Sequence, residues 1–185
     1  MSHVDESQVT KVAERIRESG GAHQGGSMLL AAAAAYGASP RSEDATIPTG
    51  FDPQAGALFE ALVEAAFLVA NADGDFDATE RDAFQRVVLN ACRGAVLAPR
   101  LEALLADLQD QLDEDGLEKR IAMIGRAVLK APQQYEVLRI AGLLAHISGD
   151  VSAVERGVLD ALASSFGLEE GAVAHALDEV RAVLA

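Results

Sequence analysis

The feature that most constrains the fold is a sixteen-residue segment that occurs twice, at an offset of 75 residues. The first copy, residues 66–81, reads Ala-Phe-Leu-Val-Ala-Asn-Ala-Asp-Gly-Asp-Phe-Asp-Ala-Thr-Glu-Arg. The second, residues 141–156, reads Ala-Gly-Leu-Leu-Ala-His-Ile-Ser-Gly-Asp-Val-Ser-Ala-Val-Glu-Arg, and eight of the sixteen positions are identical. Each copy joins an apolar helix to an amphipathic one through an acidic loop. Because one such hairpin cannot cover its own apolar helix, we expect the two to pair around a single core with approximate twofold symmetry.

Hydrophobic periodicity predicts helices throughout the rest of the chain. Half of the residues are hydrophobic but only 4% are aromatic, and alanine and leucine, both strong helix formers, are abundant. Apolar residues recur at helical spacing from residue 52 or 53 to the end, and no segment alternates as a strand would. A turn is predicted over residues 113–116, which read Asp-Glu-Asp-Gly. These patterns predict an all-α bundle of about seven helices over residues 51–185.

The first fifty residues are predicted to form a flexible N-terminal tail with two short helices. Residues 5–19 carry Val9, Val12, Ala13 and Ile16 at helical spacing, and residues 27–36 are rich in alanine. Paired glycines separate these helices, and residues 40–53 form a polar linker with three of the five prolines. Three locations are open for the alanine-rich helix: packed on the domain, bound to a partner, or at a membrane surface. Docking is expected, because a helix of about ten residues is marginal alone in water.

The charge of the chain restricts its partners. A formal net charge of −14 repels nucleic-acid phosphates and anionic lipids but is compatible with metal cations and basic protein surfaces as partners. A solvated acidic surface without a specific partner is the commoner explanation of such a charge. The single cysteine, Cys92, allows no intrachain disulfide, fits a reducing cytoplasm and is expected to be a small core residue. The start of the chain lacks the pattern of a secretion signal. The longest apolar run, 28–36, is about half of the ~20 residues that a transmembrane helix needs, so only peripheral membrane association stays open.

Most of the repeated loop residues fit the needs of a tight helix–loop–helix turn. Gly74 and Gly149 stand where a chain leaving a helix favours a left-handed residue. Asp77 and Ser152 are good N-caps for the next helix, and a glutamate follows each cap three residues later, as in a capping box. These glutamates are Glu80 and Glu155. Glycine, cap and glutamate are therefore explained without any ligand.

Asp73 and Asp75 are not explained in this way. Asp73 is expected at the C-terminal end of a helix, where the helix dipole disfavours a negative charge and invites a compensating cation. We therefore predict a divalent-cation site for Ca²⁺ or Mg²⁺ made of Asp73, Asp75, Asp77 and Glu80. The spacing is not that of an EF-hand, which needs a central glycine and a closing glutamate. The alternative, helix caps within a merely solvated acidic face, stays open.

The second loop is a weaker candidate for the same chemistry. Asp150 and Glu155 form its acidic pair, but Ser148 stands where the first copy has Asp73. Elsewhere the histidines and the cysteine lack the spacing of a zinc site, and neither a phosphate-binding loop nor a nucleophile motif occurs. We therefore expect no enzymatic activity.

The segment 68–81 resembles the signature of the TerB-like family, named for a tellurite-resistance protein. That family repeats an apolar helix, Ala-Asp-Gly, a short spacer and a glutamate that opens the next helix. The second copy, from Ser148 to Glu155, is similar but lacks the first aspartate. The resemblance covers about residues 51–185. It implies a bundle of about seven helices with two pseudo-twofold repeats, in which the family's acidic pair falls on Asp73 and Glu80.

The resemblance also implies a role without catalysis. TerB-like proteins are linked to tellurite resistance, stress response and metal sensing near membranes, and similar domains occur in a membrane-anchored co-chaperone. The leading hypothesis is a cytoplasmic stress-response module whose acidic loops bind divalent cations or a basic protein. The alternative is a structural protein–protein interaction scaffold, co-chaperone-like and without a metal site, with the N-terminal helices as its partner-binding element.

Overall fold

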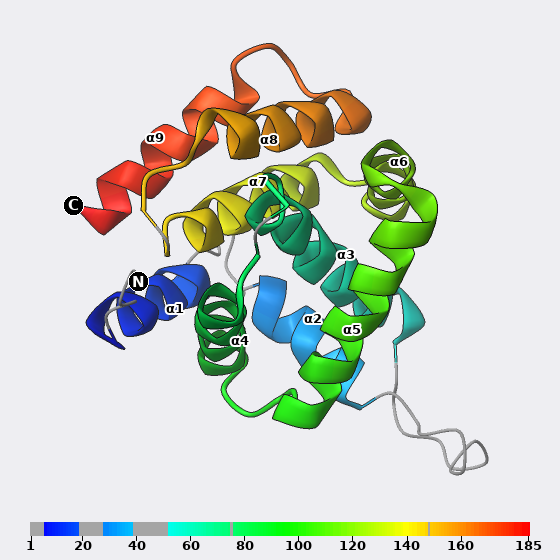
Figure 1. Cartoon of the computed structure of the whole chain (residues 1–185), viewed down its shortest axis with the longest axis vertical. Helices are drawn as coiled ribbons and strands as arrows, with labels where there is room; N and C mark the ends of the chain where they lie inside the picture. The colour runs from blue at the N-terminus through cyan, green and yellow to red at the C-terminus, as the bar shows by residue number, and fades with distance from the viewer. Residues whose placement is uncertain (1–5, 19–27, 39–51, 75, 148) are drawn as a thin grey trace.

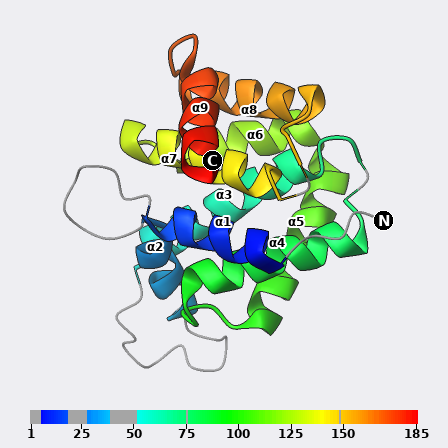
Figure 2. The same ribbon diagram turned by 90° about the vertical axis from the view of Figure 1, so that its left-hand side faces the viewer.

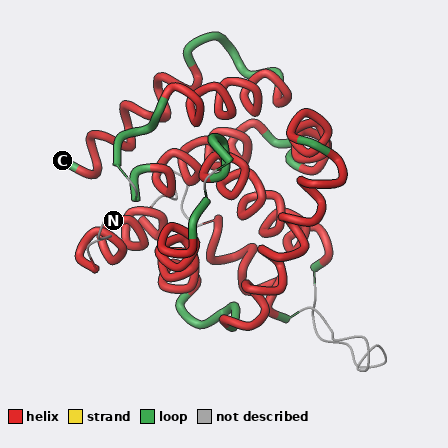
Figure 3. Tube along the Cα trace, in the orientation of Figure 1, coloured by secondary structure: helices red, strands yellow, loops and turns green. Residues whose placement is uncertain are grey.

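The computed structural model describes residues 6–18, 28–38, 52–74, 76–147 and 149–185, and every regular element in these ranges is a helix (Figures 1 and 3). This confirms the all-α prediction. In chain order the elements are α1 (Glu6–Glu18), α2 (Met28–Gly37), α3 (Pro53–Ala70), α4 (Ala78–Cys92), α5 (Ala98–Asp115), α6 (Leu117–Ala127), α7 (Ala131–Ala145), α8 (Ala153–Phe166) and α9 (Ala172–Leu184).

Helices α3 and α7 form the centre of the bundle, as their apolar sequences predict. Asp52 caps α3 by accepting hydrogen bonds from the backbone N–H groups of Gln54 and Ala55, and Pro53 suits the first helical position. Helix α3 packs against α7 and α2, and also contacts α5, α6 and α8 (Figure 1). Because neighbouring helices cover α3 on most sides, most of its faces are buried, which explains why the helix is apolar nearly all round.

Helix α3 is also the one described helix that is long and apolar enough to cross a membrane. That statement rests on length and composition alone, and 67% of its apolar stretch is buried inside the bundle. The central helix of any packed bundle meets the same two criteria. Burial against the other helices therefore accounts for its composition.

Helices α1 and α2 belong to the same core as the rest of the bundle. Val9, Val12 and Ile16 of α1 are fully buried, and α1 lies against α4 (Figure 2). Polar contacts add to this docking: Gln8 donates to the carbonyl of His146 at 2.9 Å, and Lys11 donates to the carbonyl of Leu184. The predicted boundary near residue 50 falls within residues 39–51, which lie outside the described residues, so that boundary stays a prediction.

The turn predicted over residues 113–116 is wrong, because α5 continues through Asp115. Only Gly116, with φ of 76°, separates α5 from α6. The Asp115 carboxylate accepts a hydrogen bond from Arg120 at 3.1 Å, which joins the end of α5 to the first turns of α6. The acidic residues that suggested a turn therefore form the last turn of α5, and one of them, Asp115, is hydrogen-bonded to α6.

Candidate cation-binding pocket

The first acidic loop is built as a capping box. Helix α3 ends at Ala70, and Gly74 follows with φ of 83°, a left-handed conformation that favours glycine. Asp77 Oδ1 accepts from the backbone N–H groups of Thr79 and Glu80, at 2.7 and 2.9 Å. Glu80 Oε2 accepts in return from the Asp77 N–H at 3.3 Å. The predicted roles of Asp77 and Glu80 as cap and capping-box partner are confirmed.

The second loop repeats this arrangement 75 residues later. Ser152 Oγ accepts from the Glu155 N–H at 3.2 Å, and Glu155 Oε2 accepts from the Ser152 N–H at 2.7 Å. The capping box predicted for this loop is also confirmed. Each glutamate is thus fixed at the first turn of its helix by one carboxylate oxygen, while its other oxygen, Oε1, is not used in the cap.

Of the remaining predicted ligands, two are exposed and one lies outside the described residues. Asp73 is exposed in the turn after α3, and Asp150 is exposed at the start of the second loop. Asp75 lies outside the described residues, as does Ser148. Within the described ranges, no three His, Cys, Asp or Glu side chains are grouped as metal ligands. Because Asp75 belongs to the predicted set, the four-residue metal site stays a prediction.

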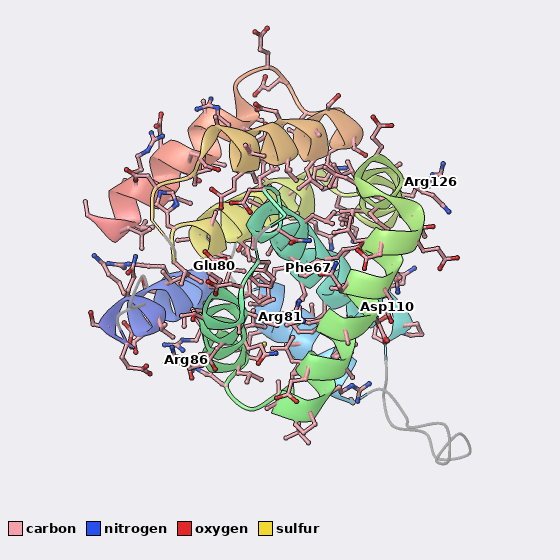
Figure 4. All side chains as sticks on the ribbon, viewed as in Figure 1. Phe67, Glu80, Arg81, Arg86, Asp110 and Arg126 are labelled. Atoms are coloured by element: carbon pink, nitrogen blue, oxygen red, sulfur yellow. The ribbon has the colours of Figure 1, made fainter. Side chains whose placement is uncertain are left out.

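The structure brings the two capping glutamates to one place. Glu80, at the start of α4 (Figure 4), and Glu155, at the start of α8, line the same pocket beside the end of α7. The other lining residues are apolar: Ala70, Phe76, Phe84, Leu144, Ala145 and Ile147. We call this the inter-loop pocket. It leaves about 20 Å³ for the centre of a water-sized molecule, which is enough for about one such group.

Aromatic residues form one wall of the inter-loop pocket. Phe76 makes edge-to-face contacts with Phe67 and Phe84, with ring centroids 5.8 Å apart in both pairs. The guanidinium of Arg81 lies 5.5 Å from the centroid of the Phe76 ring, within the range of a cation–π contact. The last residue of the first repeat, Arg81, therefore contacts an aromatic ring of this wall.

The electrostatic environment of Glu80 opposes its negative charge. Burial raises the pKa of the Glu80 carboxyl above its ordinary value, and the hydrogen bond from the Asp77 N–H lowers it in part. The negative charges of Asp77, Asp73 and Glu155 raise this pKa further. Among the described residues, no Lys, Arg or His forms an ion pair with Glu80 or Glu155. A cation placed between these two glutamates would relieve this repulsion.

The sequence predicts two separate loop sites and does not predict the inter-loop pocket between them. The available signal was the constant 75-residue offset, which places Glu80 and Glu155 at equivalent positions. Phe76 and Phe84 were missed as pocket residues, because Phe76 lies inside an acidic loop and Phe84 matches an ordinary core position.

Cys92 is buried as expected, and burial raises its thiol pKa to about 12, so it has little thiolate character at neutral pH.

Comparisons of the chain with protein-family models, with curated proteins and with solved structures gave no match.

Proposed function

We propose that this chain is a non-enzymatic, TerB-like module of the cytoplasm that acts in a stress response of the tellurite-resistance type. Its acidic loop face would bind divalent cations, Ca²⁺ or Mg²⁺, or a basic protein partner. We define the acidic loop face as Asp73, Asp75, Asp77 and Glu80 of the first loop with Asp150 and Glu155 of the second. One observation carries the proposal: carboxylates from both loops line a single pocket without a cation from the described chain.

Features of the fold support the TerB-like part of the proposal. The described region from residue 53 onward contains seven helices, α3 to α9, as the resemblance implies. Both acidic loops join a buried helix to an amphipathic one and use the same capping box. The pseudo-twofold pairing of the two hairpins is part of the proposal, and the meeting of Glu80 with Glu155 supports it.

The test is a calorimetric and thermal-shift titration with Ca²⁺, Mg²⁺ and Zn²⁺. We expect saturable binding by the wild type, weakened by Asp73→Asn and by Glu80→Gln, because each substitution removes one negative charge and an anionic oxygen ligand. Asp110→Asn is the matched control, since Asp110 is an exposed aspartate on α5 (Figure 4). If the wild type shows no saturable binding at millimolar metal, the divalent-cation half of the proposal fails.

A structural scaffold without a cation site is the second candidate. The observation in its favour is that Asp77, Glu80 and Glu155 already make capping hydrogen bonds, and these bonds alone account for the three residues without any ligand. For this candidate we expect Glu80→Gln and Glu155→Gln to change only the free energy of unfolding. Binding of metals or basic peptides that depends on these glutamates would reject it.

A further inference from the structure

We propose that the inter-loop pocket receives the ammonium group of a lysine side chain from a protein partner, held between Glu80 and Glu155. This inference rests on the proposed function and commits to its basic-protein form. The size of the pocket, its apolar walls and its two carboxylates together define the ligand.

The two carboxylates are available from opposite hairpins. The capping bonds use Oε2 of Glu80 and Oε2 of Glu155, so Oε1 of each can accept a further hydrogen bond. An ammonium group has three donors and no acceptor, which suits a pocket lined by two carboxylates from different helices. The capping bonds fix both side chains before a ligand arrives, so little side-chain entropy is lost on binding.

The apolar walls favour an alkylammonium over a metal ion. Ca²⁺ takes six to eight oxygen ligands and Mg²⁺ retains several waters, whereas the lining supplies oxygens from only two glutamates and leaves room for about one water-sized group. An ammonium group is itself about the size of one water molecule, and the apolar side chains of Phe76, Phe84, Leu144 and Ile147 around it suit the methylene next to the charge, while the rest of the lysine stem lies outside the pocket. The planar guanidinium of arginine is larger and is a poorer match for this space.

The charge of the whole chain also favours a cationic ligand. The net charge of −14 attracts basic segments over a longer range and raises their association rates. A lysine at the pocket would replace the mutual repulsion of two carboxylates by two charge-assisted hydrogen bonds.

The test is NMR on protein with isotope-labelled leucine and isoleucine methyl groups. The probe is the blocked pentapeptide Gly-Gly-Lys-Gly-Gly at millimolar concentration, compared with peptides carrying Nε-acetyl-lysine, norleucine or arginine at the centre. We expect the lysine peptide to shift the methyl signals of Leu144 and Ile147, and the acetyl-lysine and norleucine peptides to leave them in place. Higher salt should weaken the effect, because screening reduces the attraction of exposed charges.

Glu80→Gln and Glu155→Gln test the two carboxylates separately. A glutamine side chain keeps a carbonyl oxygen for the capping bond but loses the charge. We expect each variant to weaken lysine-peptide binding about fivefold or more, as for loss of a charged hydrogen-bond partner. Asp110→Asn also removes one negative charge, but from α5, and should change the affinity for the lysine peptide less than about twofold. Thermal melts establish that each variant is folded.

Three outcomes would overturn the inference. Equal shifts with the lysine and acetyl-lysine peptides would show that the ammonium is not recognised. Lysine binding that survives both glutamine substitutions would place the ligand elsewhere. Divalent-cation binding without lysine binding would reject the lysine pocket and leave the proposed function standing, whereas failure of both metals and basic peptides would reject the two together.

Discussion

Glu64 and Arg120 form a buried ion pair that links the central helix to α6. Arg120 Nε donates to Glu64 Oε1 at 2.6 Å, and both side chains are less than a tenth exposed. Arg120 also donates to Asp115 Oδ2 at 3.1 Å. Breaking a buried pair costs more than the pair contributes, because the remaining charge loses its compensation.

Arg120→Met should therefore lower the free energy of unfolding by about 3–5 kcal/mol. Glu64→Leu should cost less, because Asp115 still compensates the charge of Arg120, and the double variant should cost less than the two single changes combined. Urea unfolding of the two single variants and the double variant measures these changes in the free energy of unfolding. Arg126→Met, at an exposed position on α6, is the control, and an equal cost at residues 120 and 126 would contradict the prediction (Figure 4).

The raised pKa of Glu80 gives its contribution to stability a definite sign. Because its carboxyl binds a proton more readily in the folded than in the unfolded chain, its protonation stabilises the fold. This contribution is fully present below the unfolded-state pKa and is lost as the pH rises through the raised folded-state value.

The difference in the free energy of unfolding between wild type and Glu80→Gln should therefore shift in favour of the wild type as the pH falls from 7 towards the ordinary glutamate pKa of about 4.3. Urea unfolding across this range measures the difference, in which the titration of other carboxyls cancels. A difference that does not change with pH, or changes in the opposite direction, would contradict the prediction.

At the scale of elements, the end of α2 is fitted closely to the segment before α5. A Cβ added at Gly37 would lie 1.9 Å from the backbone carbonyl oxygen of Ala95, too close for any side chain. Arg100 reinforces this contact, with its guanidinium 4.5 Å from the centroid of the Tyr36 ring. Glycine is thus required here by space.

Gly37→Ala should destabilise the protein, although alanine is favoured over glycine in a helix by about 1 kcal/mol. Gly157, in α8, is a matched control because a Cβ there meets no atom within 4 Å. Gly157→Ala should raise the free energy of unfolding by about 0.5–1 kcal/mol. Thermal melts compare the stability of the two variants. Stabilisation by both substitutions would contradict the prediction, because it would mean that the backbone at Ala95 moves aside to accept the added Cβ.

Helix α1 shows whether the N-terminal segment is core or appendage. Ile16 is fully buried, so Ile16→Ala should lower the free energy of unfolding by about 2–5 kcal/mol. Glu14→Ala, at an exposed position of the same helix, should have an effect of at most about 0.5 kcal/mol. Denaturant unfolding measures both. Equal, small effects would instead fit a tail that contributes nothing to the folded domain.

At the scale of the whole molecule, net charge opposes the compact state. With 29 acidic and 15 basic residues, the folded surface carries an excess of negative charge that repels itself. Raising sodium chloride from about 20 to about 300 mM shortens the range of this repulsion. The melting temperature should therefore rise with salt, as scanning calorimetry measures, and a fall would mean that attractive surface ion pairs dominate.

The sequence determined the helices and their caps, because these depend on residues a few positions apart. Hydrophobic spacing predicted the two central helices, and the Asp77–Glu80 and Ser152–Glu155 capping boxes followed from a three-residue separation. The same local reasoning failed at 113–116, where the acidic residues belong to a helix and Asp115 is paired with a residue of the next one.

Only the tertiary structure decided what those local elements form together. The docking of α1, the burial of Glu64 against Arg120 and the convergence of Glu80 with Glu155 each join residues more than fifty positions apart. Such contacts depend on how apolar faces pack in three dimensions, and a periodic pattern identifies a face without identifying what covers it. The inter-loop pocket therefore arises from packing, although both of its glutamates are helix caps that the sequence predicts.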